Sequence, residues 1–367
     1  MRLLCAALAW VVGGTGCLAP DASKFPAANP SELRPGGDTT VALGAKPSFV
    51  LPAANLPQSS KTDFYAGKAL ATQPWVRAPT TTDARDGLGP LYNARSCLAC
   101  HIQGGRGETT AANGKLGRAT LARLGLPGRD PHTGGPVAEP TYGGQLQPQS
   151  TSLAHQLRGH SGARALEGLR GEATLEVQWI EAHWRYPDGT EVALRRPEVV
   201  LTGLAYGPLH EDVEIGLRHA PGLAGVGLLE LVPQSALAAL EDPDDTDDNG
   251  ISGRQNMVWD PERNTTRPGR FGLKANQPSV RVQVAAAFAG DMGITSPIFP
   301  EQPCTGAQLE CSRSPHGTDE DGFEISEALL QLVVDFDMHL GVVARRAAEH
   351  PSVSEGREQF YAAGCAD

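Results

Sequence analysis

Apolar side chains recur at helical spacing in four stretches of this chain. The first covers 62–74, where a proline ends the pattern because proline cannot continue a helix. The second covers 326–346 and closes with two arginines, which suit the negative end of a helix dipole. We expect two shorter helices after prolines, over 235–240 and over 352–363, the last with a Ser-x-x-Glu capping box.

The pattern between these helices is different. From Leu175 to Val200 its period falls to two residues, which is typical of β-strands, and a Pro-Asp-Gly turn at 187–189 divides the segment. Residues 18–58 and 102–150 are rich in glycine, proline and small residues and show no sustained periodicity. The pattern therefore predicts a mainly α fold with one inserted β-hairpin and long irregular connections.

The N-terminus has the layout of a bacterial export signal. Arg2 precedes an apolar run over 3–12, and small residues then lead to Cys17. The run is too short to remain in a bilayer as a spanning helix, so we expect residues 1–17 to direct export to the periplasm. Cys17 resembles the lipidated cysteine of bacterial lipoproteins and is the predicted membrane anchor. The alternative is an incidental cysteine beside an ordinary cleavage site.

The net charge limits which partners the protein can bind, and the expected compartment determines whether its cysteines are oxidised. The 367 residues have a net charge of −11 and no basic cluster, so we expect no nucleic-acid partner. An exported chain meets an oxidising compartment, where Cys304 and Cys311 are expected to form a disulfide. Closure of such a short loop stabilises a fold by about 2.5 kcal/mol.

The strongest chemical signal is the segment Cys97-Leu-Ala-Cys100-His101. In the C-x-x-C-H motif of c-type cytochromes, two thiols add to the haem vinyl groups and the histidine binds iron. A thioredoxin-like dithiol is a weaker interpretation, because no βαβ pattern surrounds the pair. A zinc site would need a second Cys or His pair, and His132 is isolated. A structural disulfide between the two cysteines would make His101 coincidental.

The sixth iron position has several candidates: water, a methionine or a second histidine. Met292 is the main candidate, because it lies in a segment of small and polar residues predicted to be a turn. The alternative is a methionine that covers a local apolar patch. Five histidines are weaker candidates, since a single histidine is more often an ordinary hydrogen-bonded residue; these are His155, His160, His183, His210 and His219.

The acidic segment 241–254 resembles the opening of a calcium loop. Asp245, Asp247 and Asn249 supply oxygen donors at positions one, three and five, and a glycine at position six permits a sharp turn. The glutamate expected at position twelve is replaced by Asn256. Calcium binding and a solvated acidic turn both remain open.

An ordered series of motifs then resembles the bacterial di-haem c-type oxidoreductase family. These proteins are described as peroxidases and are distantly similar to the bacterial di-haem cytochrome c peroxidases. The matching segments are DGLGPLYNARSCLACHIQGGRG (86–107), YGGQLQ (142–147), YPDGTEVALRRP (186–197), AYGPL (205–209), GVGLLELVP (225–233), EDPDDTDDNGISGR (241–254) and GRFGLKANQPSVRVQVAAAFAGDMGITSPIFP (269–300).

The resemblance implies cytochrome c-like haem domains and two c-type haems, one passing electrons and one meeting peroxide. It also favours calcium, which the di-haem peroxidases bind as a group. The second attachment motif is expected near SEGREQFYAAGCAD, where only Cys365 is present. We therefore expect one haem on this sequence. We interpret the sequence as a fragment of a longer two-haem protein, the alternative being a shortened natural variant in which Cys365 is a free thiol.

These inferences define an expected organisation and function. The expected segments are an export signal (1–17), a tether (18–60), a first c-type haem domain (61–150), a middle region with hairpin, acidic loop and disulfide (151–345), and the start of a second haem domain (346–367). The expected function is a periplasmic, peroxidase-like c-type haem oxidoreductase. Its partners would be a small redox protein or quinone-linked donor and a peroxide or similar oxidant. The alternatives are an electron carrier without peroxidase activity and a lipoprotein binding module with a structural haem.

Overall fold

The computed structural model describes residues 30–42, 44, 48–109, 116–151, 171–318 and 320–365. The expected export signal, with Cys17, lies outside these residues. The chain divides into two compact units, and the described parts of the small unit are 30–35 and 345–365, whereas the large unit spans 36–344. Helix accounts for 27% and strand for 20% of the structure, so the prediction of a mainly α fold was wrong.

Most helices of the large unit are short. Its α-helices are α1 (Lys61–Thr72), α2 (Cys97–Cys100), α4 (Val226–Leu231), α5 (Gln234–Ala238), α6 (Val280–Met292), α7 (Leu309–Ser312) and α8 (Glu327–Met338). Its short 3-10 segments are η3 (Gly37–Thr39), η4 (Gln58–Ser60), η5 (Asp83–Arg85) and η6 (Ile102–Gly104), whereas the small unit contains η2 (Pro30–Leu33) and α9 (Pro351–Ala362). In the part of the chain that the structure describes, no helix is both long and apolar enough to cross a bilayer.

The predicted helices are present with corrected ends. α1 confirms the helix over 62–74, but α8 stops well before the expected end at residue 346. The chain beyond α8 leaves the helix because Leu340 and Val343 form β-bridges to Pro52 and Val41. In α9 the side chain of His350, not that of Ser352, is the N-cap.

The β-structure consists of four two-stranded antiparallel sheets. The pairs are β1 (Leu91–Tyr92) with β3 (Gln149–Ser150), β2 (Thr120–Gly125) with β6 (Glu214–His219), β4 (Thr174–Arg185) with β5 (Glu191–Thr202), and β7 (Met257–Asp260) with β8 (Thr265–Pro268). The β4–β5 pair confirms the predicted hairpin. The β2–β6 pair joins segments almost a hundred residues apart, and β2 lies where an irregular connection was expected. Such non-local pairing leaves little signal in the local pattern.

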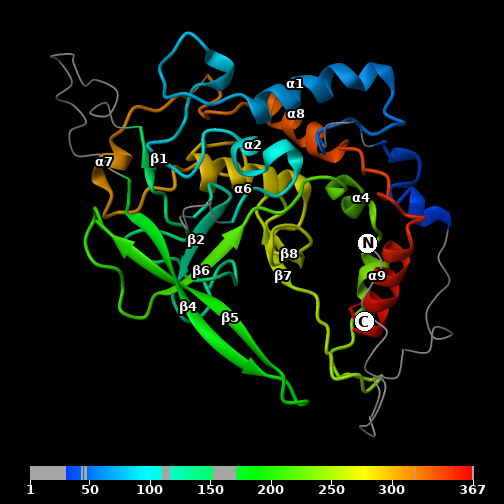
Figure 1. Ribbon diagram of the computed structural model, residues 1–367. Coiled ribbons are helices and arrows are strands. Elements are labelled where there is room, and N and C mark those ends of the chain that lie inside the picture. Colours follow the sequence, from blue (N-terminus) through cyan, green and yellow to red (C-terminus); the bar gives the residue numbers. More distant parts are fainter. Residues whose placement is uncertain are drawn as a thin grey trace, which may run out of the picture. The chain divides into compact units, whose positions relative to one another are not determined.

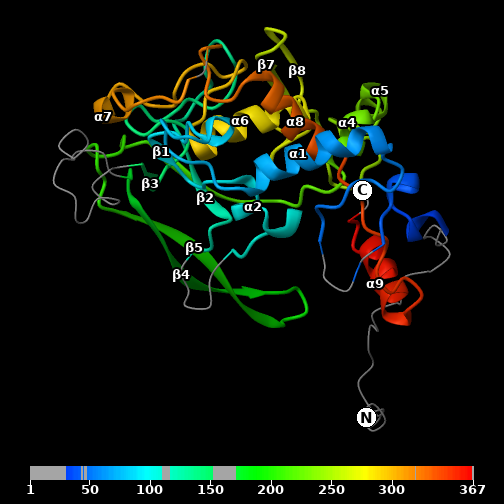
Figure 2. The same cartoon turned by 90° about the horizontal axis from the view of Figure 1, so that it is seen from above.

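The main core of the large unit lies among α1, α6 and α8, which pack side by side with α2 next to α1 (Figures 1 and 2). Helices α1 and α8 touch at Gly67, where a Cβ atom would lie only 1.9 Å from the carbonyl oxygen of Leu332. The fully buried rings of Phe64 and Phe336 meet at this crossing, with centroids 5.3 Å apart. The absence of a side chain at Gly67 is therefore what permits this close approach.

A second core cluster lies under the β2–β6 sheet and the base of the β4–β5 hairpin. It contains Leu124, Tyr142 and Leu146, with Leu175 and Leu201 packed against it. The side chain of Glu172 is only 1% exposed nearby. It accepts hydrogen bonds from the backbone N–H of Gln147 and from Nε2 of Gln308. Burial raises the pKa of Glu172 to about 7, although these two donors act in the opposite direction.

We predict that Gly67→Ala destabilises the protein by about 2 kcal/mol or more, because the new methyl group must displace the α8 backbone. The measurement is the free energy of unfolding in urea. The matched control is Gly356→Ala, also within a helix, where no atom lies within 4 Å of the added Cβ and a small gain in stability is expected. Equal effects of the two substitutions would contradict the close contact.

We predict a pH dependence from Glu172. Because its pKa is higher in the folded than in the unfolded protein, its contribution to stability is full below about pH 4.5 and is lost as the pH rises through about 7. The stability of Glu172→Gln relative to wild type should therefore rise by at most about 3 kcal/mol between pH 4 and pH 8. Unfolding titrations across this range test it, and a constant difference would show that the carboxyl group titrates normally.

Candidate functional site

The Cys97–His101 segment forms a single helical turn followed by a cap. Ser96 is extended before α2, and His101 ends the turn with non-helical dihedral angles. Both thiols are half-buried and neither is in a disulfide. Cys97 packs against the main core, and Sγ of Cys100 donates to the carbonyl oxygen of Arg118 at 3.1 Å. The turn is therefore held between the helical core and the chain leading into β2.

The imidazole of His101 is oriented by a backbone carbonyl. Its Nδ1 lies 2.7 Å from the oxygen of Pro221, and because a carbonyl only accepts hydrogen bonds, Nδ1 must be the protonated nitrogen. Burial lowers the pKa of His101, which favours the neutral ring, although the hydrogen bond to Pro221 opposes this effect. The Nε2 lone pair is then available to a metal, the usual arrangement for an iron-binding histidine.

The loop that supplies the Pro221 carbonyl is itself fixed on both sides. Before it, the N–H of Ala220 donates to the oxygen of Ala119 at 2.8 Å. After it, the N–H of Leu223 donates to the oxygen of Gly104 at 2.8 Å. Sequence reasoning missed Pro221, because a backbone oxygen 120 residues from the histidine has no signature in the sequence.

The electrostatics of the two cysteines differ from those of a redox dithiol. Burial raises the pKa of Cys97, and the negative charges of Asp337 and Asp291 raise it further. Burial also raises the pKa of Cys100, to about 11. A reactive dithiol requires a stabilised thiolate, and in thioredoxin-like proteins it follows a strand of a βαβ unit. The described sheets are all antiparallel, so neither condition is met.

A zinc site at this position also lacks geometric support. Within the described ranges, one group of three or more His, Cys, Asp or Glu ligand atoms lies within 4.8 Å, and it consists of aspartates elsewhere in the chain. The atoms of Cys97, Cys100 and His101 therefore do not converge on a single point. Haem needs no such convergence, because the thiols bind the edge of the macrocycle and the histidine binds its centre.

Two carboxylates near the motif were not predicted. Asp337 lies in the last turn of α8, where burial raises its pKa to about 7. Asp291 lies near the end of α6, and its carboxylate accepts from Nε2 of Gln145 at 2.7 Å. The backbone oxygen of Asp291 accepts from the N–H groups of Asn93 and Ala94 at 2.8 and 3.1 Å. α6 thereby anchors the segment that enters the haem motif.

Met292 does not lie in a polar turn, as the sequence suggested. It is the last residue of α6, is 2% exposed and belongs to the main core cluster, against which Cys97 and Leu98 also pack. Its role as an iron ligand stays a prediction. His219 lies near His101 and 3.3 Å from Oγ1 of Thr120.

The other histidine candidates lie elsewhere. His183 contacts Glu181 at 3.0 Å on the hairpin, and His210 precedes β6 on the surface. His155 and His160 lie outside the described residues.

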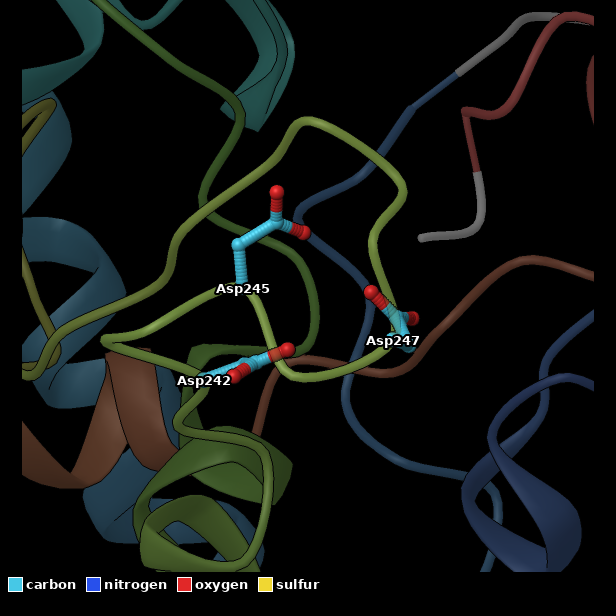
Figure 3. Close-up of side chains that lie close together, drawn as sticks. All are labelled: Asp242, Asp245 and Asp247. Atoms are coloured by element: carbon cyan, nitrogen blue, oxygen red, sulfur yellow. The ribbon is translucent and has the colours of Figure 1, made fainter.

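The acidic loop differs from the predicted ligand set. Carboxylate oxygens of Asp242, Asp245 and Asp247 lie within 4.8 Å of one another, and Figure 3 shows the three side chains on the same loop. The amide oxygen of Asn249 instead accepts from the N–H of Ile251 at 2.7 Å. Sequence spacing missed Asp242, which lies three residues before the predicted first position; its carboxylate accepts from the N–H of Thr246 at 2.9 Å, next to Asp245 and Asp247.

The remaining predicted cysteine sites are separate from the haem motif. Cys304 and Cys311 form a disulfide at the start of α7. Cys365 is free and exposed after α9, in the small unit. Its assignment to a second attachment motif stays a prediction.

Comparison with known proteins gives one match. The sequence family described as "Di-haem oxidoreductase, putative peroxidase" matches residues 31–367. Neither a curated protein nor a solved structure matches the chain. The match extends over the haem motif, the hairpin, the acidic loop and the disulfide.

Proposed function

The chain belongs to the di-haem oxidoreductase family, and from this premise we propose that it is a peroxidase-like haem c oxidoreductase. Cys97 and Cys100 are the covalent anchors and His101 is the proximal iron ligand in this proposal. The observation that supports it most directly is the 2.7 Å contact between Nδ1 of His101 and the Pro221 oxygen, which leaves Nε2 available beside two free thiols.

The donor set fits haem c better than the alternative groups. Two protonated, half-buried thiols suit thioether formation, whereas a zinc ion would need converging thiolates. When bound, haem supplies the electron-transfer and peroxide chemistry, and the protein controls ligation, polarity and access. Burial favours the neutral form of His101, and the Pro221 carbonyl orients its ring. The negative charge of Asp291 and the carboxyl group of Asp337 lie close to the motif, and negative charge there favours ferric over ferrous iron.

A specific observation supports an electron carrier as the second candidate. Met292 lies in the same core cluster that Cys97 packs against. A buried methionine that occupied the sixth position would exclude peroxide and leave electron transfer as the remaining activity. The state of the sixth position thus separates the two functions.

The proposed setting is the periplasm, with attachment to the membrane through a lipid on Cys17. The net charge of −11 suits a small, positively charged or neutral redox protein as electron donor better than an acidic one, and a quinone-linked donor is the alternative. Peroxide, or a similar oxidant, would be the electron acceptor. The sequence contains one complete C-x-x-C-H motif, so we propose one haem on these 367 residues.

We also propose a calcium site in the acidic loop. Asp242, Asp245 and Asp247 supply oxygen ligands, the type that calcium prefers. The hydrogen bonds that their carboxylates accept from the N–H groups of Thr246, Asn249 and Gly250 hold the loop in its present shape. A bound cation would offset the repulsion among the three carboxylates.

The haem prediction concerns the attachment residues. When the protein is made with a cytochrome c maturation system, the double variant Cys97→Ala and Cys100→Ala should lose covalent haem staining on a denaturing gel, because no thiol remains to form a thioether. Cys365→Ala is the matched control, since this cysteine is free and exposed, and it should stain normally. Undiminished staining of the double variant would contradict haem attachment at this motif.

The haem-loaded protein can also distinguish a peroxidase-like enzyme from an electron carrier. Ferric wild type is expected to show an exchangeable sixth position, a spectral change on addition of peroxide and turnover with a reduced donor. Met292→Leu should then leave the spin state unchanged. If Met292→Leu instead converts low-spin iron to high-spin iron and wild type is inert to peroxide, the electron carrier is the correct function.

The calcium prediction concerns thermal stability. A chelator should lower the melting temperature of wild type, and added calcium should restore it, because a ligand that binds only the folded state stabilises that state. The variant Asp245→Asn should melt at one temperature with or without calcium. A wild-type melting curve that ignores both chelator and calcium would support the solvated acidic turn.

A further inference from the structure

The β4–β5 hairpin is a long arm whose strands pair only with each other among the described residues. Figures 1 and 2 show it projecting away from the α1–α6–α8 layer. An isolated two-stranded sheet is marginally stable in water and usually needs a third strand or a packed face. This arm instead exposes large apolar side chains: Trp179 is 38%, Trp184 59%, Tyr186 50% and Leu194 54% exposed.

The hydrogen-bond pattern shows which backbone groups of the arm point outward. The N–H of Tyr186 donates to the oxygen of Thr190 at 2.9 Å, so even-numbered residues form the bonds inside the hairpin. The N–H and C=O groups of odd-numbered residues therefore point away from the partner strand. Pro197, paired with Trp179, has no N–H and interrupts the outer edge of β5. The outer edge of β4 contains no proline, and none of its groups bonds to another described backbone segment.

We propose that the outer edge of β4 pairs with the same edge of a second copy of this chain. The pairing is antiparallel, with the two-fold axis at Ala182, and it joins the two arms into a four-stranded sheet. A two-fold interface must be self-complementary, because the same strand supplies both sides. The edge of β4, which no proline interrupts, meets this condition, and an exposed strand edge is a template on which another strand can pair.

The side chains of β4 are complementary in this register. With Ala182 opposite Ala182 of the partner subunit, Glu181 lies opposite His183 of the partner subunit on one face. On the other face, Ile180 lies opposite Trp184 of the partner subunit. Within one chain Glu181 and His183 already approach to 3.0 Å, so the pairing gathers two such pairs around the axis. An axis at Glu181 would instead place two like charges opposite each other.

A membrane surface is a less suitable binding partner for this hairpin arm than a second copy of the chain. Its acidic side chains outnumber its arginines, namely Glu176, Glu181, Asp188, Glu191 and Glu198 against Arg185, Arg195 and Arg196. The arm would therefore be repelled by anionic lipids, which attract basic segments. Arg185 and Arg195 are also already engaged, with Glu191 and with the ring of Trp179.

The test is a disulfide cross-link in the haem-loaded protein with Cys365→Ser as background. Ala182→Cys should give a disulfide-linked dimer on a non-reducing gel. In an antiparallel sheet, directly opposed residues that do not hydrogen-bond to each other have Cα atoms about 4.5 Å apart, close enough for a disulfide. Gln178→Cys is the matched control on the same strand and face. In the proposed register its two copies are about 27 Å apart and should not cross-link. Equal cross-linking of both variants, or none of either, would overturn the proposal.

The oligomeric state gives a second measurement. Wild type should sediment as a dimer at micromolar concentration, Glu181→Lys should shift it toward monomer, and Glu181→Lys combined with His183→Glu should restore the dimer. A wild type that stays monomeric would overturn the proposal. So would a monomer that binds vesicles of phosphatidylcholine and phosphatidylglycerol with a blue shift of its tryptophan fluorescence, which would assign the arm to the membrane.

Discussion

The direct backbone contact between α1 and α8 at Gly67 is the constraint on which the large unit depends. Because no Cβ separates the two helices there, Phe64 and Phe336 come together and the core closes around them. The single turn of α2 then rests on this core through Cys97 and Leu98. The position of Cys97 therefore depends on a helix crossing that joins residues 67 and 332.

The histidine depends on a second, independent support. Its orientation is set by a carbonyl in the loop after β6, and that loop is tied by hydrogen bonds to Gly104 and Ala119, which both follow the C-x-x-C-H motif. The β2–β6 sheet thus orients His101 indirectly, because the loop after β6 places the oxygen of Pro221 next to Nδ1 of His101. The helical core supports Cys97, the chain leading into β2 accepts a hydrogen bond from Cys100, and the loop after β6 orients His101, so the three groups are held by different parts of the large unit.

The acidic loop and the hairpin arm are stabilised differently from the segment that contains Cys97, Cys100 and His101. The loop is held by short-range hydrogen bonds, such as those from Asn249 and Gly250 to Asp245. The arm is held by its own strand pairing and by the apolar contacts of Leu175 and Leu201 at its base. Both elements therefore extend beyond the main helical core.

The sequence by itself determined what depends on neighbouring residues. The C-x-x-C-H spacing predicted a haem motif, alternation with a Pro-Asp-Gly turn identified the hairpin, and apolar spacing located α1 and the start of α8. It did not determine pairings between distant segments. The β2–β6 sheet and the Pro221 carbonyl beside His101 both join residues that are far apart along the chain. α6 was missed because its alternating valines are typical of a strand, whereas Ser279 caps it as a helix and burial against α8 stabilises it. Tertiary packing decided these points, because the free energy of burial and of backbone pairing is gained only when distant segments meet.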